Sequence, residues 1–315
     1  MYDRRKSRKF LVRYLLCKIF VIKLGVENKN DMNAHGYLVS GLLFGFIRFI
    51  EKNAKYPIKF LMRDAGPMLF TANKLKKCGI SKLESYEEVY LTRNVVGLYT
   101  REKPCEEHLQ KKQWLISKYL EQHGINENHT QVDTGVLGTI PKALYGQNKK
   151  RKIQSLYFSS GRDIKYDGNG EKPWFCGMSD AFLRYSTGGA SRWDINTYAA
   201  PILECSPKKC DVAVADFRLN ENGKVVFEPK LFQGEKINDY KNYYQGIDDG
   251  LNDIIKRGTE LDEKSLKALF QIIYKLYKES GITWKIENTK SNLLNIKHDD
   301  LYKARDSIEQ IYCGK

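Results

Sequence analysis

Four short apolar segments, each followed by polar or charged residues, limit most strongly what this chain can fold into. Their lengths predict buried strands, and segments with helical spacing of apolar residues separate them. Strands that alternate with helices favour a parallel sheet covered by helices on both faces. We therefore predict an α/β fold with a three-layer, Rossmann-like parallel sheet. The four segments are IKFLM before RDAG, EEVYL before TRN, TQV before DTGVLG, and IQSLYF before SSGR.

The rest of the chain is expected to add three features to this sheet. Residues 1–30 place a basic head before an apolar stretch and predict a basic N-terminal helix. Residues 31–258 are assigned to the α/β domain, with an irregular Gly-, Asp- and Ser-rich insertion near 162–201. Apolar alternation on both sides of NENG, residues 220–223, predicts a β-hairpin. Residues 259–315 predict a C-terminal helical layer.

The composition favours a folded chain with anionic partners. The 315 residues are 42% hydrophobic, which supports a packed core and excludes a largely disordered chain. A net charge of +15 favours phosphorylated small molecules, nucleic acid or an acidic membrane surface. Among the seven cysteines only Cys205 and Cys210 lie close together, which argues for a cytoplasmic chain with free thiols and against a structural zinc site.

Two basic segments each allow two interpretations. Residues 1–25 either pack on the domain or lie on an anionic membrane surface as an amphipathic helix. Lys18 and Lys23 interrupt the apolar part, so this segment is too charged to span a bilayer. The cluster at residues 149–152 lacks interleaved aromatic residues, which favours a solvated loop over a nucleic-acid interface.

Carboxylates are expected at the edge of the sheet where the parallel strands end, which is where ligands bind in such sheets. Asp64 follows the first predicted strand, and its role there would be nucleophile, general base or Mg²⁺ ligand. An alternative is that Asp64 caps the helix that Pro67 opens. Asp133 ends the third predicted strand. Asp64 and Asp133 are thus the candidate catalytic residues and the candidate ligands of a Mg²⁺ cofactor.

Two further strand ends carry groups suited to a phosphate. Arg63 and Arg93 follow neighbouring predicted strands, and two guanidinium groups near one cleft favour an anion between them. Thr92 adds a hydroxyl that can donate to a phosphate oxygen. The alternative is that one arginine points outward and pairs with Glu87 or Glu88.

The segment DTGVLGT is the third candidate phosphate site. A strand that runs through glycines into a helix can direct backbone N–H groups at an anion. The expected binding groups are the backbone of Gly135 and Gly138 and the hydroxyls of Thr134 and Thr139. The segment matches neither a Walker A loop nor the G-x-G-x-x-G pattern, and a tight turn remains the alternative.

These segments together resemble bacterial predicted hydrolases of the haloacid dehalogenase superfamily, which often occur with polysaccharide or glycosyltransferase modules. The matching segments are GYLVSGLLFGF, FLMRDAG, LTRN and VDTGVLGT, and the resemblance spans most of residues 36–255. The D-x-D-x-[TV] signature of that superfamily is absent, and Ala-Gly follows Asp64. The resemblance therefore implies a Rossmann-like domain with a site at the strand ends, and does not imply aspartyl-phosphate chemistry.

Three functions remain open at this point. The first is a hydrolase or transferase that acts on a phosphorylated small molecule or nucleotide-sugar. The second is a phosphoribosyltransferase-like enzyme, although such enzymes usually carry two acids before the Thr-Gly run and only Asp133 is present here. The third is a non-catalytic module that binds anions, membrane or nucleic acid, and its binding would weaken steeply with salt.

Overall fold

The structure is a computed structural model that describes most of the chain outside three long segments. The described residues are 31–62, 64–102, 106–136, 139–147, 151–160, 180–181, 203, 206–258, 261–279 and 298–313. The predicted N-terminal helix lies outside them, as does the predicted insertion apart from a two-residue strand.

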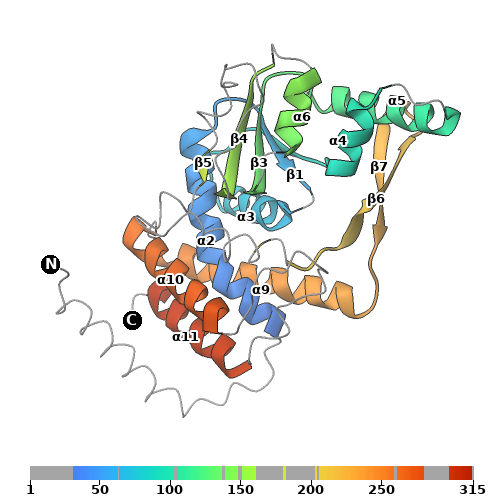
Figure 1. Cartoon of the computed structure of the whole chain (residues 1–315). Coiled ribbons are helices and arrows are strands. Elements are labelled where there is room, and N and C mark those ends of the chain that lie inside the picture. The colour runs from blue at the N-terminus through green and yellow to red at the C-terminus, as the bar shows by residue number, and fades with distance from the viewer. Residues whose placement is uncertain are drawn as a thin grey trace.

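Five parallel strands form one sheet in the order β2-β1-β3-β4-β5 (Figure 1). This confirms the predicted α/β class and the predicted parallel sheet. From β1 the chain adds β2 on one side and then β3, β4 and β5 on the other, so the direction of winding reverses between β1 and β3. The strands are β1 (Ile58–Leu61), β2 (Tyr86–Val89), β3 (His129–Val136), β4 (Ile153–Ser160) and β5 (Asp180–Ala181).

Helices cover both faces of this sheet. Alternate side chains of a strand point to opposite faces, so Phe60 and Leu61 belong to two different cores. On the Phe60 face, α2 (Asp31–Asn53) and α3 (Gly66–Lys77) pack against the strands. On the Leu61 face lie α4 (Arg93–Thr100), α5 (Glu107–Gln122) and α6 (Thr139–Gln147). The layers are helix, sheet and helix.

Helix α4 was not expected from the sequence, because TRN was assigned to the end of a strand and no helix was assigned between that strand and residue 106. In the structure β2 ends at Val89 and α4 begins at Arg93. Thr92 is the N-cap of α4: its backbone is extended, and its hydroxyl accepts a hydrogen bond from the Val95 N–H at 3.3 Å. Threonine at this position satisfies a helix N–H that has no partner inside the helix.

The three C-terminal helices pack against the half of α2 that extends beyond the sheet (Figure 1). They are α9 (Glu235–Arg257), α10 (Glu263–Glu279) and α11 (His298–Cys313). Helices α2 and α9 cross at glycines. A Cβ on Gly246 would lie 1.9 Å from the Asn33 carbonyl oxygen, and one on Gly36 would lie 1.9 Å from that of Tyr243. The helical layer thus includes α9 as well as α10 and α11, which lie within the predicted residues 259–315.

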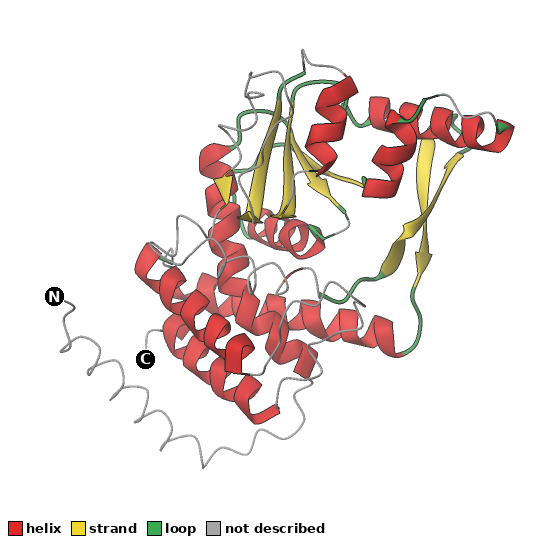
Figure 2. Ribbon diagram, viewed as in Figure 1, coloured by secondary structure: helices red, strands yellow, loops and turns green. Residues whose placement is uncertain are grey.

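The predicted hairpin is confirmed and lies apart from the main sheet (Figure 2). Strands β6 (Cys210–Leu219) and β7 (Val225–Leu231) are antiparallel and contact α5. The Asn220 side chain accepts hydrogen bonds from the N–H groups of Asn222 and Lys224, and Gly223 adopts a positive φ of 70° that glycine tolerates best.

In the described part of the chain, every helix is too short or too polar to cross a membrane.

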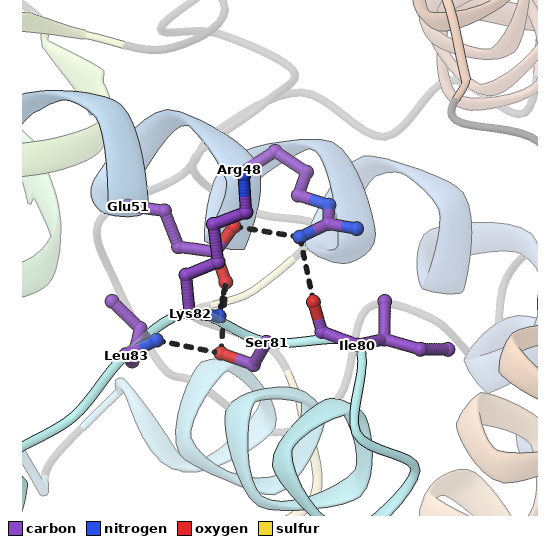
Figure 3. Close-up of polar contacts among 6 residues, drawn as sticks. All are labelled: Arg48, Glu51, Ile80, Ser81, Lys82 and Leu83. Carbon is purple, nitrogen blue, oxygen red and sulfur yellow. Dashed lines mark hydrogen bonds and ion pairs between the residues drawn. The ribbon is translucent and has the colours of Figure 1, made fainter.

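A polar network joins the loop between α3 and β2 to helix α2 (Figure 3). The Glu51 carboxylate accepts hydrogen bonds from Arg48 at 2.7 Å and from the Ser81 hydroxyl and the Lys82 N–H at 2.8 Å each. Arg48 also donates to the Ile80 carbonyl at 3.0 Å. The Glu51 side chain is 8% exposed, so its charge is balanced by these donors and not by water. The network fixes where the chain turns from α3 towards β2.

Candidate functional site

A pocket of about 190 Å³ lies at the carboxyl edge of the sheet, and we call it the edge pocket. Its walls come from the end of β2, the first turns of α3, the segment that precedes β6, and α9. The side chains that line it include two lysines, one carboxylate and four aromatic rings. They are Lys208, Lys209, Glu88, Phe70, Tyr90, Tyr240 and Tyr244.

Helix α3 starts at this pocket without a side-chain cap. Gly66 and Pro67 line the pocket, and the N-cap residue, Ala65, has no polar group to offer. The first turn of α3 contains no acidic residue. The first turn of α3 therefore lies in the pocket wall, where the partial positive charge of the helix N-terminus would stabilise an anion.

Asp64 is not the helix cap that was the alternative interpretation, since Ala65 is the N-cap residue of α3 and the Asp64 carboxylate binds a lysine. Lys208 Nζ donates to Asp64 Oδ1 at 2.6 Å, and Asp64 is only 5% exposed. A buried carboxylate of this kind needs a nearby cation, since the charge is costly to remove from water alone. Lys208 also lines the edge pocket, so Asp64 holds this ammonium group at the pocket wall.

The two residues after β2 that were predicted to bind a phosphate, Thr92 and Arg93, belong to the start of helix α4. The Thr92 hydroxyl is used as the cap of α4, and Thr92 is buried. Arg93 is the first residue of α4 and is exposed. A phosphate role for these two residues stays a prediction, and the cap already occupies the Thr92 oxygen.

Glu87 was one of the acids expected, in the alternative interpretation, to pair with an arginine at a strand end. In the structure its carboxylate binds a lysine and a histidine. Its carboxylate bonds to Lys59 on β1 and to His123 Nδ1 at 2.8 Å. Partial burial alone would raise the pKa of Glu87, but the hydrogen bonds from Lys59 and His123 lower that pKa below its ordinary value. This ion pair ties the edge strand β2 to β1 and to the end of α5.

The segment DTGVLGT begins inside a strand and not after it. Strand β3 continues to Val136, and Gly135 pairs in register with Ser159 of β4. Asp133 Oδ1 accepts hydrogen bonds from the N–H of Thr134 at 2.8 Å and from its hydroxyl at 3.4 Å. An extended glycine is compatible with a strand, so the expected strand end at Asp133 is wrong by three residues. Arg63 and Gly138 lie outside the described residues.

The two predicted acids lie in different surroundings. Asp133 alternates with Val132, which belongs to the Phe60 core, so the Asp133 side chain points to the opposite face of the sheet. Asp64 instead precedes α3, which packs on the Phe60 face. Thr139, the first residue of α6, is exposed. Joint metal binding by Asp64 and Asp133 stays a prediction.

Polar groups without partners lie beside Asp133 on the Leu61 face. Gln131 and Ser155 are paired in register, as are Asp133 and Tyr157. Among the described residues, Gln131 Oε1, Ser155 Oγ and the Tyr157 hydroxyl have no partner in hydrogen-bond geometry, and all three residues are at most 2% exposed. Burial raises the pKa of Tyr157 and outweighs the contact with the Ser155 hydroxyl, which lowers it; the charge of Asp133 also raises this pKa, so the Tyr157 hydroxyl stays protonated.

A group of possible metal ligands exists elsewhere in the described part of the chain. Asp253 on α9 and Glu309 and Cys313 on α11 place one ligand atom each within 4.8 Å of one another. The Asp253 carboxylate already accepts a hydrogen bond from the Tyr37 hydroxyl at 2.8 Å. This group lies in the helical layer, away from the strand ends, and nothing beyond its acidic character indicates an ion.

The groups that line the edge pocket were missed by sequence reasoning because they come from segments far apart in the chain. Lys208 and Lys209 lie in CSPKKC, where the cysteine spacing is the local pattern and says nothing about a pocket. Tyr240 and Tyr244 are four residues apart and so share one face of α9, which is also typical of core packing. No local pattern distinguishes these tyrosines from core residues.

Comparison of the chain with models of known protein families gives no match, and comparison with curated proteins gives none either. The resemblance to the haloacid dehalogenase superfamily therefore stays a hypothesis.

Proposed function

We propose that the edge pocket binds a phosphorylated small molecule and that the chain is a phosphate-handling enzyme of the hydrolase or transferase type. The observation that carries this proposal is the meeting of three positive groups at one pocket. They are the uncapped N-terminus of α3, the ammonium of Lys208 and that of Lys209. The Asp64 carboxylate binds Lys208 and the Glu88 carboxylate lines the pocket, so a phosphate would depend on direct charge-assisted hydrogen bonds from the two ammonium groups.

The strand order supports a ligand at the same edge of the sheet, although the edge pocket itself lies on the β2 side of β1. The order β2-β1-β3-β4-β5 is the second common arrangement of doubly wound sheets, and we assign the sheet to this Rossmann-like class. In such sheets, ligands bind beyond the carboxyl ends of the strands, at the point where the winding reverses. Here that point lies between β1 and β3, and the loop after β1 carries Asp64.

Asp64 is the carboxylate best placed to take part in the reaction. Lys208 would hold a phosphoryl oxygen and stabilise the negative charge that develops during transfer. Asp64, released from Lys208 when the phosphate binds, would accept a proton from the attacking water or hydroxyl group. Mg²⁺ fits this chemistry, since carboxylate and phosphate oxygens are its preferred ligands.

Three variants test this proposal. Lys208→Ala and Lys209→Ala should each weaken the binding of sugar phosphates or pyrophosphate by about tenfold to a hundredfold, because each removes a charge-assisted hydrogen bond. Asp64→Asn should abolish turnover while phosphate binding persists. Calorimetric titration and a phosphate-release assay measure the two effects.

The control is Lys142→Ala, on the exposed surface of α6, which should bind and turn over like the wild type. Unchanged binding in both Lys208→Ala and Lys209→Ala would refute the proposed site. Binding without turnover in the wild type would instead identify a non-catalytic anion-binding module.

A further inference from the structure

One wall of the edge pocket is aromatic, which a phosphate alone does not explain. The rings of Tyr240 and Tyr244 on α9 lie 4.3 Å apart, and Phe70 of α3 meets Tyr244 edge-on at 5.0 Å. Tyr90, after β2, stacks on Phe227 of the hairpin at 4.0 Å. These contacts hold the rings in place, so the wall is a rigid surface suited to a flat, apolar ligand group.

The aromatic wall joins the positive end of the pocket at Gly66. A Cβ on Gly66 would lie 2.7 Å from the Tyr244 hydroxyl, so this hydroxyl sits against the first turn of α3. Burial raises the pKa of Tyr244 well above its ordinary value, and burial also raises that of Tyr240. Both hydroxyls therefore stay protonated and can donate hydrogen bonds to a ligand.

Glu88 adds a carboxylate to the lining of the pocket. It pairs in register with Phe60, so its side chain points to the α3 face of the sheet, and it is exposed at the pocket. Its negative charge repels a phosphate but accepts hydrogen bonds from sugar hydroxyls. A ligand would therefore place its phosphate at the lysines and its hydroxyls at Glu88.

We propose that the ligand of the edge pocket is a ribonucleoside phosphate. The base stacks on the aromatic wall, the ribose hydroxyls donate to Glu88, and the phosphate lies at Lys208, Lys209 and the start of α3. This inference rests on the proposed function and adds the identity of the group that carries the phosphate. The pocket is smaller than the roughly 300–1,000 Å³ of pockets that enclose a whole drug-sized ligand, so part of the nucleotide extends into solvent.

The test compares ligands on the wild-type chain before any residue is changed. Calorimetric titrations with AMP, GMP, CMP and UMP are set against ribose 5-phosphate, which has the sugar and phosphate but no base. At least one nucleotide should bind about tenfold more tightly or better, as base stacking on an aromatic ring predicts. The 2′,3′-dideoxy form of that nucleotide should bind severalfold more weakly.

Variants then locate the base and the ribose. Tyr240→Leu keeps the apolar bulk but removes the ring, so the preference for the nucleotide over ribose 5-phosphate should largely disappear. Glu88→Ala, which removes the acceptor oxygens, should bind the ribonucleotide and its dideoxy form almost equally. Tyr145→Ala, which changes a tyrosine on α6 at the other face of the sheet, is the control and should leave both preferences unchanged.

The outcomes separate this inference from the proposed function. If ribose 5-phosphate binds as tightly as every nucleotide, the phosphate site stands and the nucleotide inference is wrong. If the preference for a nucleotide survives in Tyr240→Leu, the aromatic wall is not where the base binds, and the inference is again overturned. If no phosphorylated ligand binds, both proposals fail.

Discussion

At the scale of single residues, the unusual feature is the row of buried polar side chains on the Leu61 face of β3 and β4. His129 is completely buried, yet its two ring nitrogens are both used: Nδ1 contacts the Glu127 carbonyl oxygen and Nε2 contacts the Gln131 amide, each at 2.9 Å. Further along the row, the Ser155 and Tyr157 hydroxyls have no partner in hydrogen-bond geometry among the described residues. The row therefore includes polar side chains with hydrogen-bond partners and polar side chains without partners in hydrogen-bond geometry. Substitution of the first kind should lower the stability of the fold, and substitution of the second kind should not.

Tyr157→Phe should leave stability unchanged or raise the free energy of unfolding by up to about 1 kcal/mol. The substitution removes a buried hydroxyl whose contact with the Ser155 hydroxyl lies outside regular hydrogen-bond geometry, and the ring that fills the core stays. Urea denaturation of both proteins measures the difference. A loss of more than about 1 kcal/mol would mean that the hydroxyl is hydrogen-bonded, for example to an ordered water molecule.

His129 should make the chain less stable as the pH falls from 7 to 5. Burial lowers the pKa of His129 to about 4, and the charges of Arg151 and Lys59 act in the same direction. The unfolded chain, with an ordinary histidine pKa of about 6.5, then binds a proton that the folded chain does not. The stabilising effect is complete above about pH 6.5 and is lost progressively as the pH falls towards 4.

Between pH 7 and pH 5 the expected loss is about 2 kcal/mol of the free energy of unfolding. His129→Gln, which cannot titrate, should lack this part of the pH dependence even if it is less stable at every pH. Denaturation curves at both pH values are compared within each protein. An equal loss in wild type and variant would show that other groups cause it.

At the scale of elements, the closest contact is the crossing of α2 and α9. Gly36 and Gly246 face backbone atoms of the opposite helix, which a larger residue would push apart. Gly250 likewise faces Ser40, whose Oγ would lie 2.1 Å from an added Cβ. This crossing sets where α9 lies, and α9 carries Tyr240 and Tyr244 to the edge pocket. The glycines thus position the aromatic wall without being part of it.

Gly246→Ala should destabilise the chain by about 2 kcal/mol or more, because the obstructing atom is a backbone carbonyl oxygen that cannot rotate away. Gly97→Ala is the matched control. Gly97 also lies inside a helix, but an added Cβ there meets no atom within 4 Å, so the change should be neutral or stabilising by about 0.5–1 kcal/mol. Equal effects of the two substitutions on the melting temperature would contradict the tight crossing.

Helices and strands could be predicted from the sequence where a single local pattern of residues indicated their type. The apolar runs of β1 and β4, the long amphipathic α5 and the turn-forming NENG of the hairpin were each interpreted correctly from the sequence. Helix α4 was missed because Thr92 was considered as a ligand group and not as a cap. Strand β3 was expected to end early because Gly135 was taken as the start of a turn.

At the scale of the whole molecule, the edge pocket depends on how separate parts of the chain are brought together. Strand β2 contributes Glu88, and helix α3, which follows β1, contributes its first turn. The segment before the hairpin contributes the two lysines, and α9 of the helical layer contributes Tyr240 and Tyr244. From the sequence, a ligand site was predicted at the carboxyl edge of the sheet, with Asp64 as one of its residues. The Asp64 carboxylate binds Lys208. Lys208 itself was not predicted, because 144 residues separate the two partners and no local spacing reveals such a contact.

The most direct test of the central claim is a crystal structure of the chain soaked with ribose 5-phosphate. We expect the phosphate group to lie within hydrogen-bond distance of Lys208 and of the first turn of α3. A phosphate bound instead at Thr134–Thr139, or anywhere away from the edge pocket, would contradict this account.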